Sequence, residues 1–169
     1  MLDRVLQTKR LKLRPVRAAD AKDIANGIGV WEVIRWLTSP PWPYTLADAE
    51  WFLGQDTLNT YYGIEIDGAL RGVVSISFDF DMGYWLAIPY HGNGYMTEAA
   101  SAVVARHFEH SDETLTSGYL LGNAVSANVL GKIWFQNTLL RTDYSTPMKA
   151  DVQVQRMELT AQKYWTDHA

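Results

Sequence analysis

A short loop with two glycines, between an expected strand and an expected helix, constrains this chain more than any other feature. The strand covers about residues 81–87 and the helix begins near Tyr95, so Gly92 and Gly94 lie where one element passes into the other. Glycine adopts positive φ and lets a ligand approach the backbone closely. The first turn of the helix adds free N–H groups and the positive end of the helix dipole. This arrangement predicts an anion site that suits a pyrophosphate.

The loop alone leaves other interpretations open. A plain strand-to-helix turn would contain the same two glycines, and two nucleotide-binding motifs compete with it. A Walker loop needs Gly-Lys-Ser/Thr after its glycines, and that sequence is absent here. A Rossmann fingerprint needs a glycine or alanine three residues after Gly94, where this chain has Thr97. The loop therefore indicates an anion site without identifying the ligand.

Composition narrows the class of ligand and of chemistry. The chain has 15 basic and 19 acidic residues and a formal net charge of −4. That balance argues against nucleic acid as the main ligand and suits a cationic or amine-bearing one. The chain has no cysteine, which excludes disulfides, thiolate catalysis and cysteine-ligated metals. His107 and His110 lack the spacing of the His-Glu-x-x-His zinc motif, so we expect no metal.

Length and hydropathy predict one domain, residues 1–169, because domains commonly have about 100–200 residues. The first 13 residues are charged and alternate in polarity, without the apolar segment of a signal peptide. No stretch approaches the ~18 apolar residues that a membrane-spanning helix requires. We therefore expect a cytoplasmic protein that does not insert in a membrane.

Local patterns place the first elements. Residues 10–16 alternate, with Lys12 and Arg14 on the face opposite the leucines, which is typical of a half-buried strand. Asp20 and Thr45 are good helix N-caps, because their side-chain oxygens can accept the free N–H groups of a first helical turn. Two short helices are expected, after Asp20 and at 30–37, and residues 46–53 after Thr45 also carry a helical pattern.

The Asp67-Gly68 pair predicts a tight hairpin between strands at residues 59–66 and 70–78. Alternation gives one face of the second strand to Leu70, Gly72, Val74, Ile76 and Phe78. The helix after the glycine loop has apolar residues at helical spacing. They are Met96, Ala99, Ala100, Val103, Val104 and Phe108.

Three further elements complete the expected order: a strand at 115–121, a helix at 126–135, and a strand at 152–159 followed by a short polar tail. The whole order, β-αα-βββ-α-β-α-β, predicts an α+β fold. In such a fold a central mixed sheet has helices on both faces.

Four segments in this order resemble those of one superfamily. Residues Gly83–Ala99, which contain the glycine loop, are similar to motif A of the GNAT superfamily of N-acetyltransferases. Three more segments resemble its RimJ/RimL-like branch, the ribosomal-protein N-terminal acetyltransferases. They are Thr8–Pro15 with Asp20, Pro40–Phe52, and Asn123–Ser126 with Lys132 and Phe135. The chain departs from the family pattern at His91 and Met96 in the loop, and at Trp134, where the family usually has a glycine.

The resemblance implies the GNAT fold and an acetyl-CoA-dependent N-acetyltransferase. A substrate amine would attack the thioester directly in a ternary complex, and CoA would be the product. The loop would bind the pyrophosphate, the backbone after Trp85 would bind the pantetheine arm and stabilise charge on the thioester oxygen, and Asn123 would bond the pantetheine amides. The expected cofactor-binding residues are Leu86, Ala87, Ile88, His91, Gly92, Asn93, Gly94, Tyr95, Met96, Thr97 and Asn123.

The resemblance also implies catalytic residues. Ser126 matches a family position near the cofactor sulfur, where it would protonate the leaving thiolate; the alternative is an N-cap for the following helix. Asp81 lies where the family often has an acidic residue that faces the substrate. Alternation places Asp79, Asp81, Gly83 and Trp85 on one face of the strand. Either carboxylate would act as a base through water, attract a cationic amine, or be an exposed loop residue.

The acceptor is less well defined. Aromatic residues are expected to line its groove, or to pack within loops: Trp36, Trp42, Tyr44 and Trp134. The acceptor is expected to be a primary amine, either a protein N-terminal α-amine or a small molecule such as a polyamine, an amino acid or an antibiotic. A non-catalytic acyl-CoA-binding module is the alternative from another class. The resemblance is also compatible with a homodimer.

Overall fold

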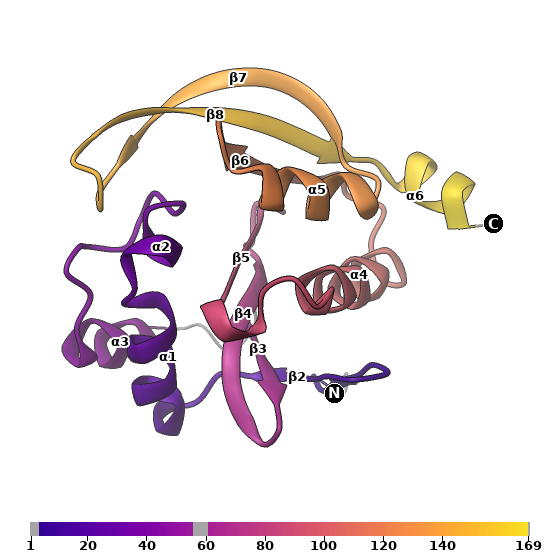
Figure 1. Cartoon of the computed structure of the whole chain (residues 1–169). Coiled ribbons are helices and arrows are strands. Elements are labelled where there is room, and N and C mark those ends of the chain that lie inside the picture. Colours follow the sequence, from indigo (N-terminus) through magenta and orange to yellow (C-terminus); the bar gives the residue numbers. More distant parts are fainter. Residues whose placement is uncertain (1–3, 56–60, 169) are drawn as a thin grey trace.

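A computed structural model describes residues 4–55 and 61–168. Its largest element is a five-stranded antiparallel sheet in the order β1-β2-β3-β4-β5 (Figure 1). The strands are β1 Leu6–Gln7, β2 Lys12–Pro15, β3 Tyr61–Ile66, β4 Ala69–Ile76 and β5 Met82–Leu86. Residues 59 and 60, which were expected to begin the third of these strands, lie outside the described residues.

The turn between β3 and β4 confirms the expected hairpin. Asp67 and Gly68 both have positive φ, at 51° and 80°. A two-residue turn with positive φ at both positions matches the right-handed twist of the strands that it joins.

A β-bulge at Arg71 changes which face of β4 some residues occupy. Ile64 of β3 pairs with Gly72, but the next residue, Glu65, pairs with Leu70, so Arg71 is the extra residue on β4. Leu70 is thereby turned to the face of Val73, and both pack in one hydrophobic cluster, whereas Val74 packs in the other. The expectation that Leu70 and Val74 share a face is therefore wrong, because simple alternation does not survive a bulge.

Helices cover both faces of this sheet (Figure 1). On one face lie α1 Ala21–Ile28, α2 Trp31–Ile34 and α3 Leu46–Leu53, and on the other lies α4 Tyr95–Phe108. Each face has its own hydrophobic core. The sheet is thus the middle layer of three, as the expected fold class requires.

Two local predictions about helices are confirmed. The six expected apolar positions of α4 are all buried, none more than 7% exposed. Thr45 caps α3, because its hydroxyl accepts the N–H of Asp48 while the Asp48 carboxylate accepts the N–H of Thr45. Within the described ranges, no helix has both the length and the apolar character that a membrane span needs.

A second, three-stranded antiparallel sheet has the order β6-β8-β7. Its strands are β6 Leu115–Leu120, β7 Gln136–Ser145 and β8 Ala150–Leu159; α5 Ala124–Lys132 follows β6, and α6 Ala161–His168 ends the described chain. β7 and α6 correct the expected order, which had one final strand and a polar tail. β7 is almost entirely exposed and its pairing is irregular between Asn137 and Leu140, so no alternation of polarity marks it.

Arg14 corrects two further expectations. Its side chain is 7% exposed and binds Asp20 through both Nη atoms, at 2.9 and 2.8 Å, and Glu65 through Nε at 2.6 Å. Arg14 therefore does not face solvent with Lys12. The Asp20 carboxylate also accepts the N–H of Arg17, and it forms no capping bond to α1. These charges fix β2, β3 and the start of α1 to one another.

The electrostatics of this cluster follow from burial and pairing. Burial by itself would raise the pKa of Asp20, but the hydrogen bonds from Arg14 and Arg17 and their charges outweigh it and hold the pKa below its usual value. The hydrogen bond from Arg14 likewise lowers the pKa of Glu65. A carboxyl group whose pKa is lower in the folded state stabilises the fold above its unfolded pKa.

We predict that Asp20→Asn lowers the free energy of unfolding by about 3 kcal/mol at neutral pH, because it leaves a buried guanidinium without its partner. The wild-type protein should lose this contribution as the pH falls below about 4, through the lowered pKa of the folded state. The variant should therefore lose less stability than the wild type over that acidic range. Urea unfolding at several pH values measures both effects.

Asp23→Asn is the matched control, since it makes the same change three residues further along α1 and no ion pair of Asp23 is formed within the described chain. A loss of stability as small as that of the control would contradict the structural role of the Asp20 pair.

Candidate functional site

The neighbouring strands β5 and β6 are joined at one end and then separate. The N–H of Thr116 donates to the carbonyl of Phe80 at 2.9 Å, and Asp81 forms an isolated parallel bridge with Thr116. One residue further on, the Ser117 hydroxyl donates to the carbonyl of Met82 at 2.8 Å. The two strands then belong to different sheets. A cavity of about 540 Å³ lies where they part.

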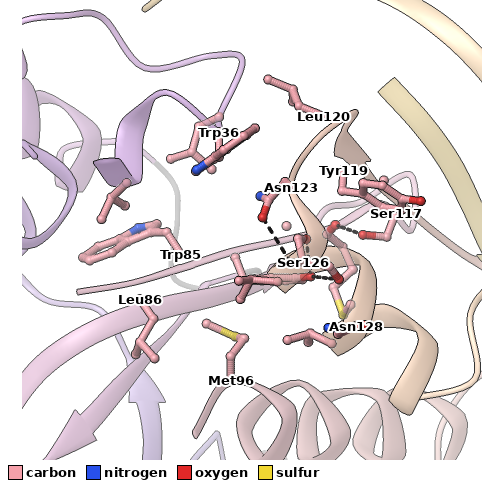
Figure 2. A pocket seen from close by; sticks show the side chains of 18 of the residues that line it. Trp36, Trp85, Leu86, Met96, Ser117, Tyr119, Leu120, Asn123, Ser126 and Asn128 are labelled. Carbon is pink, nitrogen blue, oxygen red and sulfur yellow. Dashed lines mark hydrogen bonds between the residues drawn. The ribbon is translucent and has the colours of Figure 1, made fainter. Parts of the chain in front are cut away.

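The cavity brings together segments that are distant in sequence. β5, β6, the glycine loop, α5, the end of α2 and the β7–β8 hairpin all line it. In Figure 2, Trp36 and Trp85 lie on one side of this space and Ser117 and Tyr119 on the other, with Asn123 and Ser126 between them.

The free edge of β5 presents polar backbone groups to this cavity. The carbonyl of Met82 points to the β6 side, because it accepts the Ser117 hydroxyl. The N–H of Ala87 points the other way and donates to Arg71 of β4 at 2.8 Å. Backbone groups alternate in direction along a strand, so those of Tyr84 and Leu86 face the side from which β6 has departed. Ala87 does not line the cavity, and its N–H is already used.

The glycine loop has the backbone geometry that its sequence predicts. Gly92 and Gly94 have φ of 75° and 76°, which side chains disfavour. A Cβ added at Gly92 would meet no atom within 4 Å, so the space above it is open. The N–H groups of residues 92–97 donate to no carbonyl of the described chain. The loop thus presents unpaired donors at the start of α4, where the helix dipole is positive.

Arg10 holds this loop from the N-terminal segment. Its Nη1 donates to the carbonyl of Asn93 at 2.8 Å, its Nε binds Glu98 at 2.7 Å, and its guanidinium lies 4.5 Å from the centre of the Tyr95 ring. A peptide group is planar and trans, so a carbonyl fixed on Arg10 turns the following N–H, that of Gly94, in the opposite direction. Gly94 lines the cavity, and Arg10 therefore orients one of its donors.

Two loop residues contact the protein rather than open space. His91 Nε2 lies 2.6 Å from the carbonyl oxygen of Leu86 and can donate to it, which closes the short 3₁₀ turn Ile88–Tyr90. The Asn93 side chain donates to the carbonyl of His91 at 2.9 Å and does not line the cavity. Asn93 therefore stabilises the loop. His91 lines the cavity while its ring supports the backbone.

Ser126 lies at the centre of the cavity and is paired with a tyrosine. A 2.7 Å hydrogen bond joins Ser126 Oγ and Tyr84 Oη. Burial raises the pKa of Tyr84 to about 12, although the bond with Ser126 lowers it slightly. Asn123 Oδ1 accepts the N–H of Ser126 at 3.2 Å, so Asn123 is the N-cap of α5. The alternative in which Ser126 caps this helix is therefore wrong.

Asp81 is held in a fixed position at the end of the cavity opposite the glycine loop. Its Oδ1 atom accepts the hydroxyl of Thr116 at 2.7 Å and a short hydrogen bond from Arg156 Nη2. Gly118 of β6 leaves no room for a side chain beside β8, because a Cβ there would lie 2.8 Å from the carbonyl oxygen of Gln155 and 3.1 Å from Arg156 Nη1. Asp79, in contrast, is exposed and bonds the hydroxyl of Ser77 outside the cavity.

A second ion pair lies beside the first. Arg141 and Asp143 of β7 form a bidentate pair, with both N–O distances at 2.7 Å. Arg141 is opposite Val154 of β8, two residues from Arg156, and the side chains of both pairs line the cavity. Two arginines and two aspartates therefore form one network at this end.

Of the aromatic residues expected at the acceptor groove, Trp36 lines the cavity and the other three do not. Trp42 packs on Trp31 with ring centres 5.2 Å apart, and Tyr44 is partly buried against the cluster that contains the apolar residues of α1. Trp134 packs against His168 of α6 at 4.1 Å. These contacts favour the alternative, in which Trp42, Tyr44 and Trp134 pack within loops and against helices instead of lining the acceptor groove.

The structure adds residues that sequence reasoning missed. Tyr84 contacts Ser126, Trp85 forms a cavity wall, and Arg156 and Arg141 contribute the positive charge. Tyr84 and Trp85 lie inside the motif that identified the strand, and alternation already placed them on opposite faces. No sequence pattern marks the two arginines. Their neighbours are determined by the pairing of β7 with β8, which brings together residues that are distant in sequence.

Among the described residues, no three histidine, aspartate or glutamate side chains converge in a way that would hold a metal ion. His107 and His110 instead lie near the backbone carbonyl oxygens of Glu113 and Arg106, at 2.7 and 3.0 Å.

Comparison with known proteins extends these observations. A search of curated proteins gives no significant match. An acetyltransferase of the GNAT family from Bacillus anthracis superposes with a TM-score of 0.83 at 14% identity, over 94% of this chain and 99% of that one. Ribosomal-protein-S5-alanine acetyltransferase from Vibrio fischeri gives 0.75 at 20% identity, over 96% and 99%. The microcin C7 self-immunity acetyltransferase, solved with acetyl-CoA and AMP, gives 0.75 at 15% identity, over 90% and 93%.

At these identities the superpositions show a shared fold. The family model described as the acetyltransferase (GNAT) domain matches residues 10–136, which is more than half of the chain. That range contains the glycine loop, the parted strands and Ser126. The chain therefore belongs to the GNAT acetyltransferase family and is an acetyl-CoA-dependent acyltransferase.

Proposed function

We propose that this enzyme is an N-acetyltransferase that transfers the acetyl group of acetyl-CoA to a primary amine by direct attack in a ternary complex. One observation carries the proposal: a single cavity connects the donors of the glycine loop with the Ser126–Tyr84 pair and with Asp81. An anion site, a proton donor and a carboxylate are the groups that this reaction requires.

The residues present fit an acyl-CoA thioester. The open space above Gly92 and the unpaired N–H groups of residues 92–97 suit a pyrophosphate. The free edge of β5 suits an extended pantetheine arm, because the N–H of Leu86 can donate to it as to an added strand, while the Leu86 carbonyl is held by His91. Asn123 Oδ1 is occupied by Ser126, so Asn123 would donate through Nδ2. Acetyl-CoA, when bound, supplies the acetyl group as a thioester.

We assign the residues of the chain to two proton transfers. Ser126 Oγ would protonate the departing thiolate, and Tyr84 would support it through the 2.7 Å bond. Because its pKa is raised to about 12, Tyr84 keeps its proton at neutral pH and can donate to Ser126. Asp81 would hold the amine and accept its proton through water. The N–H of Tyr84, further from the glycine loop on the free edge of β5, would stabilise negative charge on the carbonyl oxygen.

Two classes of acceptor fit this proposal. The structural neighbours include one enzyme named for the alanine of a ribosomal protein and one named for microcin C7 self-immunity. A protein N-terminal α-amine and a small-molecule amine are therefore both to be tested. Thiol release from acetyl-CoA, measured with N-terminal peptides and with small amines, distinguishes them. Binding of acetyl-CoA without turnover of any amine would indicate a non-catalytic binding module.

We predict that Gly94→Val weakens acetyl-CoA binding by at least about ten-fold while the protein stays folded. A β-branched side chain disfavours the φ of 76° and would disturb the N–H groups that face the phosphates. Isothermal titration calorimetry with acetyl-CoA measures the change in Kd.

Gly68→Val is a matched control for this variant. Gly68 has φ of 80° and a Cβ there meets no atom within 4 Å, so the backbone strain is similar, but the hairpin turn does not line the cavity. Equal affinity of the two folded variants for acetyl-CoA would show that the loop does not bind the phosphates.

We predict that Ser126→Ala lowers kcat by about 100-fold and leaves the KM for acetyl-CoA nearly unchanged, because it removes a proton donor without removing a phosphate contact. Tyr84→Phe should lower kcat by about ten-fold, since it removes one hydrogen bond to Ser126. Steady-state kinetics with a saturating acceptor measures both values.

Ser101→Ala, on α4 and outside the cavity lining, controls for the loss of a hydroxyl as such. If kcat of Ser126→Ala equals that of the control, the proton donor lies elsewhere and the assignment of Ser126 is wrong.

A further inference from the structure

The charged side chains at one end of the cavity indicate which class of acceptor it can bind. Two carboxylates, those of Asp81 and Asp143, and two guanidinium groups, those of Arg141 and Arg156, line it. A site for a simple amine needs only negative charge. Arginines beside the same space would repel a second positive charge.

Asp81 has one oxygen atom available for a ligand. Thr116 and Arg156 both contact Oδ1, whereas Oδ2 accepts no hydrogen bond from the described residues, and the side chain is 43% exposed. Its position is fixed by two partners, so Oδ2 can receive an ammonium group without reorganisation of the carboxylate. This atom is therefore available to an ammonium group of a ligand.

The arginines have donors available in the same way. Arg141 uses Nε and Nη2 for Asp143, which leaves Nη1, and its side chain is 51% exposed. Arg156 uses Nη2 for Asp81 and forms no bond through Nη1 within the described chain. Guanidinium groups bind carboxylates strongly and with defined geometry.

The two ion pairs act on each other. The hydrogen bond that Arg141 donates to Asp143 is the main cause that raises the pKa of Arg141, and the charge of Asp81 adds to it. The bond to Arg141 chiefly lowers the pKa of Asp143, and the charge of Arg156 contributes as well. Opposite charges of a ligand can therefore meet complementary groups within a short distance.

Gly83 leaves room for such a ligand. It lies between Asp81 and Trp85 on one face of β5 and lines the cavity. A Cβ built on Gly83 meets only the Ser75 hydroxyl oxygen, at 3.7 Å, so the space above it is open. Trp85 and Trp36 add apolar walls, which suit the remainder of the acceptor.

We propose that the acceptor of this enzyme presents a carboxylate within a few bonds of the amine that is acetylated, with the ammonium group on Asp81 and the carboxylate on Arg141 and Arg156. This inference rests on the proposed N-acetyltransferase function and specifies its substrate class. The carboxylate can belong to a free amino acid or to an acidic side chain at the start of a peptide. The arginines disfavour linear diamines and polyamines.

The test compares matched acceptors in the thiol-release assay. One set pairs free amino acids with their carboxamides, and the other pairs tripeptides that have aspartate or glutamate at the first or second position with their asparagine or glutamine counterparts. We expect kcat/KM to be at least about ten-fold higher for the carboxylate-bearing member of one set, because a charge-assisted hydrogen bond is lost in the neutral member. The set that shows the difference identifies the source of the carboxylate.

The variant Arg141→Gln tests the assignment to residues. It should remove most of the ten-fold preference by slowing the carboxylate-bearing member alone. Arg141 is exposed on an edge strand, so the variant should fold. Lys149→Gln removes the same charge from the turn of the same hairpin, outside the cavity, and should keep the preference.

Equal acetylation of charged and neutral members in both sets would overturn the inference and leave the proposed function standing. Efficient acetylation of a linear diamine such as 1,4-diaminobutane would overturn it as well, as would an equal loss for both members in Arg141→Gln. If acetyl-CoA binds but no amine in any set is acetylated, the proposed function itself fails, and this inference with it.

Discussion

Strands β5 and β6 run parallel where Asp81 meets Thr116 and Ser117 meets Met82, and beyond that point β5 has a polar edge without a neighbouring strand. Unpaired N–H and C=O groups are costly when they are buried, so such an edge is retained only where water or a ligand completes it. The bridge also fixes how far the strands part, because Thr116 contacts the backbone of Phe80 and the side chain of Asp81 together. The cavity, its open backbone and its charged end all begin at this junction.

The opposite end of the cavity depends on a long-range connection of a different kind. The glycine loop takes its conformation from local sequence, but its orientation is secured by Arg10 and Thr8, which reach Glu98 in the first turn of α4. Burial would raise the pKa of Glu98, and the hydrogen bonds from Thr8 and Arg10 outweigh that effect and lower it. The carboxylate thus stays ionised, and the N-terminal segment remains attached to the loop near the expected phosphate position.

The features that could be predicted from sequence are those that local physics determines. The Asp67-Gly68 turn, the Thr45 cap and the buried face of α4 each depend on a few adjacent residues, and the structure confirms them. The predictions fail where residues distant in sequence determine the burial or the strand face of a residue. The alternation of the first strand predicts that Arg14 is exposed, but its side chain is buried in ion pairs with Asp20 and Glu65. Leu70 changes face because of a bulge, and Phe78 of the same predicted face is 91% exposed. β7 has no pattern of its own because its place is set by pairing with β8.

The same division separates the two halves of the site. The proposed donor half consists mainly of backbone N–H groups, whose directions depend on the positive φ of Gly92 and Gly94, so we expect it to tolerate His91 and Met96. The proposed acceptor half would use side chains from β7 and β8, which are joined to the rest through sheet pairing and the Asp81–Arg156 contact. Residues of that hairpin can change without disturbing the loop or the free edge of β5. On this proposal, acyl donor and acceptor would be recognised by separate parts of one fold, and that fold is shared with the superposed structures at 14–20% identity.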